Sequence, residues 1–493
     1  MEFGLDKCAK CTIKKGVKVE TDGFQLDDGS IIEDLQEDAS YKYLGIEENS
    51  TIQHKYMRTK IHTSYIKRVK KICKSELTTK NKITAINQFA LPIVTYGFGI
   101  VEWPQKHLNT LDIKTRKILT LHKVIYRNQC LDRMYLPRSE GGMGLQGVSD
   151  AFRATMVSLG QYLLSNKDPL IQVVTKQHKD VLPQNISIIK LAKNFAPHLI
   201  EDVPEDPEEP EVAATFLARA KRKAYVFSEN INKTKRWKKH KRAGRFPTEL
   251  DQPYIDKEAS LKWLRKGRLG FDNEKIILAA QDQGLMTNGF KKMAGLSNND
   301  QCRFCHTAVE STSHLVSACQ TMLGDGHYTA RHNKVCRYLH WSICKEYQIE
   351  TQAVWLHEPQ LTTATEEVSI FYDKPIVLGR YVEGGAIKPD IVVWDKKKKE
   401  AWVIEVSVPN DYGLNRVERE KMNKYQDLKN DLKQTWELEK VEIIPVIVGA
   451  TGLMKTNLKS YLKSIPGNPS ADEVQLVAVT GTVSILKRAL SHD

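Results

Sequence analysis

The chain contains 493 residues, of which 41% are hydrophobic and 27% charged, and its formal net charge is +14. This length exceeds what one compact core accommodates, and the hydrophobic content excludes wholesale disorder, so we expect about two to four domains. No run of about 18 apolar residues and no signal-peptide core occurs in the sequence, so the positive charge favours nucleic acid over a membrane as the anionic partner.

Residues 55–165 predict mainly helices. Tyr65, Val69 and Ile72 recur at helical spacing, and a second helix is expected to end before Pro92. The glycine-rich stretch LPRSEGGMGLQGV lacks the preceding strand and the lysine that a phosphate-binding loop requires. We interpret it as a structural loop without a catalytic role.

An acidic, proline-rich stretch, VPEDPEEPE at residues 203–211, predicts an extended linker and a domain boundary. Residues 216–246, here called the basic segment, follow it directly, and we expect them to be exposed. The segment could track phosphates while its aromatic rings stack on unpaired bases, but a solvated helix face or a localisation signal would have the same composition. Its candidate nucleic-acid contacts are Arg222, Lys235, Arg236, Trp237 and Lys238.

Nine cysteines, an odd number, suit metal binding in a reducing compartment better than a disulfide framework. Cys302 and Cys305 form a C-x2-C turn, and His314 and Cys319 are spaced by about one helical turn. Three thiolates and one imidazole complete a tetrahedral zinc site without an open position, which predicts a structural role in a unit that helps to hold nucleic acid. These four residues are called the cysteine cluster; the alternative is incidental thiols beside a core histidine, and His306 is a spare ligand candidate.

The stretch KPDIVVWDKKKKEAWVIEVSVPND, residues 388–411, predicts a β-hairpin with a charged, exposed tip. Asp390 begins the first strand and Glu405 lies within the second, so neighbouring strands can bring both carboxylates to one place. A buried acid needs a partner, and a magnesium ion provides one while lowering the pKa of bound water for attack on phosphorus. We call Asp390 and Glu405 the carboxylate pair.

A nuclease of this kind also needs a cation near the developing charge. The pattern P-D followed by (D/E)-x-K would place lysine two residues after Glu405, where this chain has Ser407. Lys421, Lys424 and Tyr425 lie at i, i+3 and i+4 of the following helix and share a face, so a lysine there could substitute.

The same helix permits a purely structural interpretation. Glu418 is expected on the face of the two lysines. Alternatively, this is only a charged helix that packs on the sheet through Val417 and Leu428.

The order CRFC…H…C, YTARHNKV, KPD, a glutamate, KMNKY and IIPVIVGATGLM resembles the C-terminal part of site-specific non-LTR retrotransposon proteins, which carry a restriction-enzyme-like endonuclease. The stretches FGLDKCA and YKYLGI resemble the last palm strands and primer grip of their reverse transcriptase. The region from YGFGIVEWP to GGMGL resembles its thumb. The resemblance covers nearly the whole chain and depends on the order and spacing of several motifs.

This resemblance implies roles for individual residues. The cysteine cluster matches the zinc knuckle of the family, and the carboxylate pair matches its two metal-binding acids. Lys421 and Lys424 match its downstream lysine motif, and one of them would orient the water or stabilise the transition state. Arg331, His332 and Asn333 match an arginine-histidine-asparagine segment ahead of the nuclease, where the first two are expected to contact nucleic acid.

The expected architecture is a multidomain α+β protein. It comprises a remnant of the reverse transcriptase palm and primer grip (1–50), a helical thumb (51–200), an acidic linker with a basic helical connector (201–300), a zinc knuckle of the CCHC type (301–325) and an α/β restriction-endonuclease-like domain (326–493).

The expected function is that of a magnesium-dependent endonuclease which nicks duplex target DNA in the nucleus, so that the freed 3′ hydroxyl primes reverse transcription of element RNA. The polymerase aspartates of the family lie upstream of GLDKC, so we expect a fragment without DNA synthesis of its own. The main alternative is a catalytically inactive nucleic-acid-binding module built from the knuckle, the basic segment and the thumb. A weaker one is a zinc-dependent regulator unrelated to transposition.

Overall fold

The computed structural model describes residues 8–15, 17–35, 40–48, 51–200, 212–376 and 387–491. Helices and strands are mixed in an α+β structure, which confirms the expected class. The chain forms two compact units, the first comprising Met1–Glu76, Lys82–His122 and Leu145–Asn230, and the second Leu77–Asn81, Lys123–Gly144 and Ile231–Asp493. The expected linker at 203–211 lies outside the described residues.

Three short two-stranded ladders form the N-terminal part of the first unit. Each is antiparallel, and they pair β1 (Thr12–Lys14) with β2 (Val17–Val19), β3 (Phe24–Gln25) with β4 (Ile31–Ile32), and β5 (Tyr41–Tyr43) with β6 (Ile46–Glu48). Most of their side chains are exposed or half-buried. These ladders therefore contribute little apolar core.

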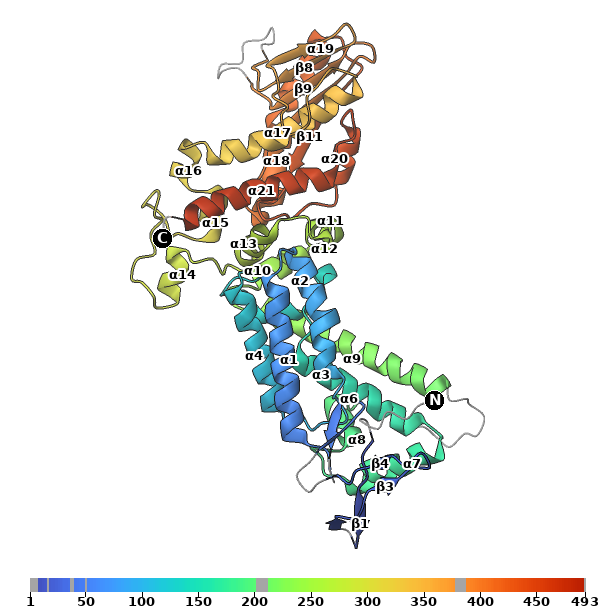
Figure 1. Ribbon diagram of the computed structural model, residues 1–493. Coiled ribbons are helices and arrows are strands. Elements are labelled where there is room, and N and C mark those ends of the chain that lie inside the picture. The colour runs from blue at the N-terminus through green and yellow to red at the C-terminus, as the bar shows by residue number, and fades with distance from the viewer. Residues whose placement is uncertain are drawn as a thin grey trace. The chain divides into compact units, whose positions relative to one another are not determined.

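The rest of the first unit is helical, as predicted (Figure 1). Its main helices are α1 (His54–Lys74), α4 (Gln105–Leu121), α6 (Val148–Ser165), α7 (Pro169–Lys176) and α8 (Ile188–Phe195). Helix α1 buries an i, i+4 stripe that includes Tyr65, whose hydroxyl lies 2.9 Å from the Thr115 hydroxyl of α4. On α6, Gly160 allows α8 to approach closely, because a Cβ there would lie 2.4 Å from the Ala192 side chain.

The helix expected to end before Pro92 instead continues through it. Helix α2 (Thr79–Ala85) passes into a π-helical turn at Ile86–Ala90 and then into α3 (Leu91–Thr95). Pro92 lies in the first turn of α3, where an N–H group is not needed for intrahelical hydrogen bonding. The helix therefore changes its hydrogen-bonding pattern just before the proline instead of ending there.

The part of the second unit before the sheet is mainly helical. It contains α5 (Leu131–Tyr135), α10 (Arg245–Leu250), α11 (Lys257–Ser260), α12 (Lys262–Lys266), α13 (Phe271–Gln281) and α14 (Asn288–Met293). The fully buried Arg133 donates to the Asp282 carboxylate at 2.9 Å and to the Gly141 carbonyl oxygen at 2.9 Å. The glycine-rich stretch thus wraps a buried ion pair, in agreement with its interpretation as a structural loop.

A five-stranded mixed sheet organises the C-terminal part of the second unit (Figure 1). Its order is β11-β10-β9-β8-β7, formed by β7 (Thr362–Ala364), β8 (Val368–Tyr372), β9 (Ile391–Asp395), β10 (Glu400–Ser407) and β11 (Lys440–Ile447). Strands β9 and β10 pair antiparallel across the lysine-rich turn, which confirms the predicted hairpin. Strand β11 joins β10 in parallel, so the chain needs the helical crossover that α18 (Leu414–Lys424) and α19 (Gln426–Thr435) supply.

Helices pack against this sheet and against each other. Leu428 and Leu432 of α19 pack with Val403 of β10 and Ile443 of β11 in one buried cluster. Helix α17 (His327–Glu346) contacts β10 and packs along the C-terminal helix α21 (Ala471–Leu490), and α20 (Leu458–Ser464) contacts β11. The sheet thereby holds the end of the β9–β10 hairpin between α17 and α18.

Candidate functional site

The carboxylate pair meets at one end of the β9–β10 hairpin. Ile391 lies opposite Ile404, so continuing the antiparallel register places Asp390 opposite Glu405. The backbone N–H of Asp390 donates to Oε2 of Glu405 at 3.4 Å. Glu405 is buried, at 3% exposure. Both acidic side chains therefore belong to one small polar site, as the hairpin predicted.

The helix after the hairpin supplies a cation and a hydroxyl to Glu405. Lys421 Nζ lies 2.5 Å from Oε1, and the Tyr425 hydroxyl donates to Oε2 at 2.7 Å. Lys424 Nζ is more distant, at 3.9 Å from Oε1, and donates to the Tyr425 oxygen at 2.8 Å. Burial and the neighbouring Glu405 raise the pKa of Tyr425, so its hydroxyl remains a donor.

Glu418 does not join this site, although the helical spacing placed it on the face of the lysines. It is buried and forms an ion pair with Lys455, while the Asn457 amide donates to it at 2.6 Å. Its carboxylate therefore links α18 to the segment after β11. Val417 and Leu428 are buried, so the packing expected of a structural helix is present together with the lysine contact.

Asp390 is oriented from both sides. His332 of α17 places Nε2 3.0 Å from Oδ2, and the Val406 N–H donates to the same oxygen at 2.7 Å. The other oxygen, Oδ1, has no hydrogen-bond partner among the described residues. Burial lowers the pKa of His332, but hydrogen bonds and charge from Asp390 and Cys336 outweigh it and raise this pKa to about 11.

Arg331 is buried, whereas a residue that contacts nucleic acid would be exposed. It is 4% exposed, and its terminal nitrogens donate to the Thr482 hydroxyl at 3.0 Å and the Val408 carbonyl oxygen at 2.9 Å. Burial lowers the pKa of Arg331 to about 10. Its role as an exposed phosphate contact is therefore corrected: this guanidinium ties α17 to α21 and to the end of β10.

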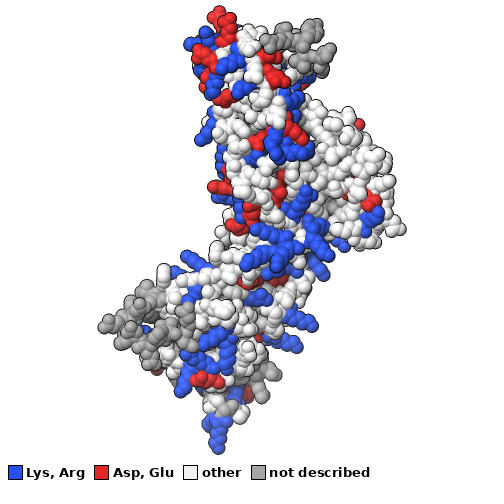
Figure 2. Space-filling model, turned by 180° about the vertical axis from the view of Figure 1, so that it is seen from behind, with Lys and Arg blue, Asp and Glu red and all other residues white. Residues whose placement is uncertain are grey.

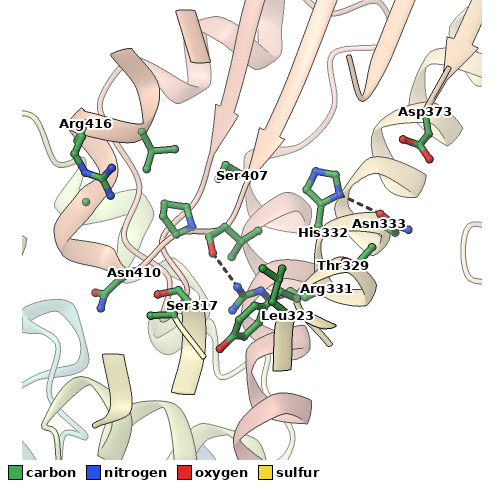
Figure 3. A pocket seen from close by; sticks show the side chains of 16 residues that line it. Ser317, Leu323, Thr329, Arg331, His332, Asn333, Asp373, Ser407, Asn410 and Arg416 are labelled. Atoms are coloured by element: carbon green, nitrogen blue, oxygen red, sulfur yellow. Dashed lines mark hydrogen bonds between the residues drawn. The ribbon is translucent and has the colours of Figure 1, made fainter. Parts of the chain in front are cut away.

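A cleft of about 670 Å³ is lined by His332 and Ser407, which neighbour the carboxylate pair in contact and in sequence, but Asp390 and Glu405 do not themselves line it. Figure 3 shows His332 and Asn333 on one side of it, Arg416 and Asn410 on the other, and Ser407 between them. His332 Nδ1 lies 3.1 Å from the Asn333 side-chain oxygen. The walls thus combine hydrogen-bonding groups with a cationic side chain.

The cysteine cluster forms as predicted. The ligand atoms of Cys302, Cys305, His314 and Cys319 all lie within 4.8 Å of one another, so the group can hold a metal ion. Cys302 Sγ is 3.8 Å from Cys319 Sγ, and Cys305 Sγ is 3.3 Å from His314 Nε2. The spare candidate His306 has a positive φ of 55° in the turn after Cys305 and is not part of the group.

Buried polar contacts join this cluster to the rest of the second unit. Arg303 lies 2.7 Å from the fully buried Glu310 and donates to the Ala489 carbonyl oxygen of α21 at 3.0 Å. The Tyr328 hydroxyl of α17 accepts from the Cys319 N–H at 3.1 Å and donates to the Leu315 carbonyl oxygen at 2.9 Å. The cluster is therefore anchored to two long helices.

Most of the basic segment lies on helix α9 (Val212–Lys239), and its aromatic residues Trp237 and Tyr225 are buried. Trp237 is 1% exposed and lies against the Arg133 guanidinium, whose carbon is 4.8 Å from the ring centroid. Tyr225 is 6% exposed. The prediction that these rings stack on unpaired bases is wrong, because both side chains contribute to the core.

Several cationic residues of the segment lie at the surface, whereas Lys233 is buried, at 7% exposure. Arg222, Lys235 and Lys238 are exposed. Arg236 donates to Asp132 at 2.8 Å, and Lys238 pairs with Asp251, so part of this charge is balanced within the protein. In Figure 2, lysine and arginine side chains gather densely on part of the visible face.

Two features of the second unit were not identified from the sequence. The contact between His332 and Asp390 joins residues 58 positions apart, and the i, i+4 spacing of His332 and Cys336 was the one available signal. The second feature is a group formed by His340, Cys344 and His357, which begins farther along the same helix.

No protein-family model matches this chain, and no curated protein matches it. The retrotransposon resemblance therefore stays a prediction from motifs. Across the described ranges, none of the helices combines the length and the apolar character that crossing a bilayer requires.

Proposed function

We propose that the chain is a metal-dependent DNA endonuclease of the non-LTR retrotransposon type. It would act in the nucleus, nicking duplex target DNA so that the freed 3′ hydroxyl primes reverse transcription of element RNA. The observation that carries this proposal is the convergence of Asp390, Glu405 and Lys421 from two strands and a helix. The order of motifs along the chain supports the biological setting.

The donor set of the carboxylate pair fits magnesium, because carboxylate oxygens are hard ligands and Oδ1 of Asp390 carries no hydrogen bond among the described residues. When bound, magnesium supplies Lewis acidity toward a phosphate oxygen and lowers the pKa of water. His332 and the Val406 N–H fix the orientation of Asp390, and Tyr425 fixes that of Glu405.

Lys421 is the residue proposed to stabilise the charge that develops on the phosphate oxygens. Its ammonium group is already placed beside Glu405, so little reorganisation is needed in the transition state. Lys424 lies farther out and would contact the nucleic-acid backbone. The adjoining cleft, with Asn333, Asn410 and Arg416 on its walls, offers room for a phosphodiester strand.

We further propose that the ion of the cysteine cluster is zinc. Three thiolates and one imidazole are the donor set of closed structural zinc sites. The anchoring of the cluster through Arg303 and Tyr328 supports a structural role. The exposed cations Arg222, Lys235 and Lys238 would bind phosphates of DNA or RNA in a salt-dependent manner.

A nicking assay on supercoiled plasmid with Mg²⁺ tests the endonuclease. Asp390→Ala is expected to abolish nicking while leaving DNA binding intact, and Asp427→Ala, which removes an exposed carboxylate from α19, is the matched control and is expected to nick normally. Nicking that survives in Asp390→Ala would refute the assignment.

One observation favours the second candidate, an inactive binding module. Lys421 and Tyr425 engage both oxygens of Glu405, as they would in a purely structural network. If the wild-type chain binds DNA but does not nick it in any divalent cation, the binding module is the better description.

A further inference from the structure

Helix α17 carries a stripe of potential metal ligands that the proposed nuclease site uses only in part. His332, Cys336, His340 and Cys344 follow one another at intervals of four residues, so they share one face of the helix. The first two lie beside Asp390. The last two meet His357 from the segment between α17 and β7, and all three of these side chains are buried.

The geometry of these three side chains is that of ligands around a common point. His340 Nδ1 lies 2.8 Å from His357 Nε2 and 3.4 Å from Cys344 Sγ. The two imidazole rings are stacked, with centroids 5.0 Å apart and planes at 28°. The ligand atoms all fall within 4.8 Å of one another.

Hydrogen bonds alone do not satisfy the polar atoms of these three side chains. Nδ1 of a neutral imidazole holds either one proton or one lone pair, yet His357 and Cys344 both approach the Nδ1 atom of His340. The other ring nitrogen of His340, Nε2, is buried without a partner among the described residues.

A tetrahedral ion resolves the competition at Nδ1. Zinc binds imidazole nitrogen at about 2.0–2.1 Å and thiolate sulfur at about 2.3 Å, so its ligand atoms lie about 3.3–3.6 Å apart. The observed separations of 2.8 and 3.4 Å need only a small outward movement to match. Two imidazoles and a thiolate also select zinc over magnesium, which prefers oxygen ligands.

We propose that His340, Cys344 and His357 form a second zinc site, separate from the cysteine cluster. The thiol of Cys344 loses its proton to solvent when the ion binds, and the three protein ligands leave one coordination position for a fourth donor. The ion joins the segment after α17 to the helix. Because His340 follows His332 by eight residues, about 12 Å along the helix axis, the site stabilises α17 without contacting the carboxylate pair.

Metal analysis of the full-length chain tests this site independently of nuclease activity. Wild-type protein purified without chelators is expected to contain about two zinc ions per chain by mass spectrometry of the elements, and Cys344→Ser or His357→Asn about one. Cys73→Ser is the matched control, since Cys73 is 2% and Cys344 1% exposed. It is expected to retain the wild-type zinc content.

Cobalt titration of the wild-type chain keeps the test valid if the variants do not fold. Two equivalents bound, the second with the charge-transfer band of a single thiolate, would support the site. A wild-type zinc content that Cys344→Ser and His357→Asn leave unchanged, or a single cobalt equivalent with only the multi-thiolate band of the cysteine cluster, would overturn it.

Discussion

Replacing Lys421 with methionine tests the proposed transition-state cation most directly. Its Nζ atom lies 2.5 Å from Glu405 and its side chain is 28% exposed, whereas Lys424 lies at 3.9 Å and is 51% exposed. Removing one preorganised hydrogen-bond donor from a site that excludes water typically lowers the catalytic rate by about 10²–10³-fold, which equals about 2.7–4 kcal/mol of activation free energy. An exposed charge is screened by solvent, so we expect Lys424→Met to cost no more than about tenfold.

Single-turnover nicking of supercoiled plasmid with saturating protein measures these rates without a contribution from binding. Lys433→Met removes an exposed lysine from α19 and serves as the control, with wild-type nicking expected. Equal losses in Lys421→Met and Lys424→Met, or full activity in Lys421→Met, would refute the assignment of the cation.

Loss of Lys421 also affects folding, because Glu405 is buried and then loses one partner. We expect a loss of about 1–3 kcal/mol in the free energy of unfolding, the usual penalty for an under-satisfied buried group. Adding Glu405→Gln should restore part of this stability, since the uncompensated charge is gone. The double variant should remain inactive, which separates catalysis from stability.

Three further predictions concern the surroundings of the site. Trp237→Ala is expected to lower the free energy of unfolding by about 3–5 kcal/mol, measured by urea denaturation with circular dichroism, because it empties a core position. Arg303→Met is expected to cost about 3–5 kcal/mol by leaving Glu310 buried and unpaired, and the pair Arg303→Met with Glu310→Gln should cost less. Although burial opposes it, Arg303 holds the pKa of Glu310 below its ordinary value. The Arg303–Glu310 ion pair therefore stabilises the fold fully at pH values above the ordinary pKa of a glutamate. This stabilisation disappears as the pH falls through the lowered pKa of Glu310, where the melting temperatures of the wild type and the double variant should converge. Lys235→Ala with Lys239→Ala is expected to weaken DNA binding and to reduce the salt slope by about 0.9 for each phosphate that is no longer neutralised, as gel shifts at several salt concentrations would measure.

Different results would contradict each of these three predictions. If Trp237→Ala left the free energy of unfolding unchanged but weakened binding of single-stranded nucleic acid, base stacking would again be the better role for Trp237. Equal melting temperatures for Arg303→Met and the pair would mean that Glu310 has other sufficient partners. A salt slope unchanged by the two lysine substitutions would place phosphate binding outside the basic segment.

The hairpin and the cysteine cluster could be predicted because their signals are local. Alternating apolar residues around a lysine-rich turn define β9 and β10, and the register then places Asp390 opposite Glu405. In the cysteine cluster, the four ligands fall within 18 consecutive residues, Cys302 to Cys319. Their spacing in the sequence is therefore nearly sufficient to bring the four side chains around one ion. Both depend on few long-range contacts.

The aromatic residues of the basic segment were misinterpreted for the opposite reason. Its composition resembles that of a nucleic-acid-binding arm, but burial of Trp237 depends on Arg133, more than 100 positions earlier in the chain. Arg331 is a similar case, because its partners Thr482 and Val408 come from distant elements. Sequence composition indicates what a side chain could bind if it were exposed. Only tertiary packing determines whether that side chain is exposed.

The substitution of a strand lysine by a helix lysine is physically reasonable because the helix is fixed by the core. Tyr425 and Leu428 follow Lys421 by four and seven residues and are buried in the same apolar cluster as Val403 of β10. A lysine one turn before such an anchor has little freedom in where its Cα lies, so its ammonium group can be as well placed as one projecting from the strand. Ser407, at the position the strand lysine would occupy, instead lines the cleft. Its small side chain leaves space there that a lysine would fill.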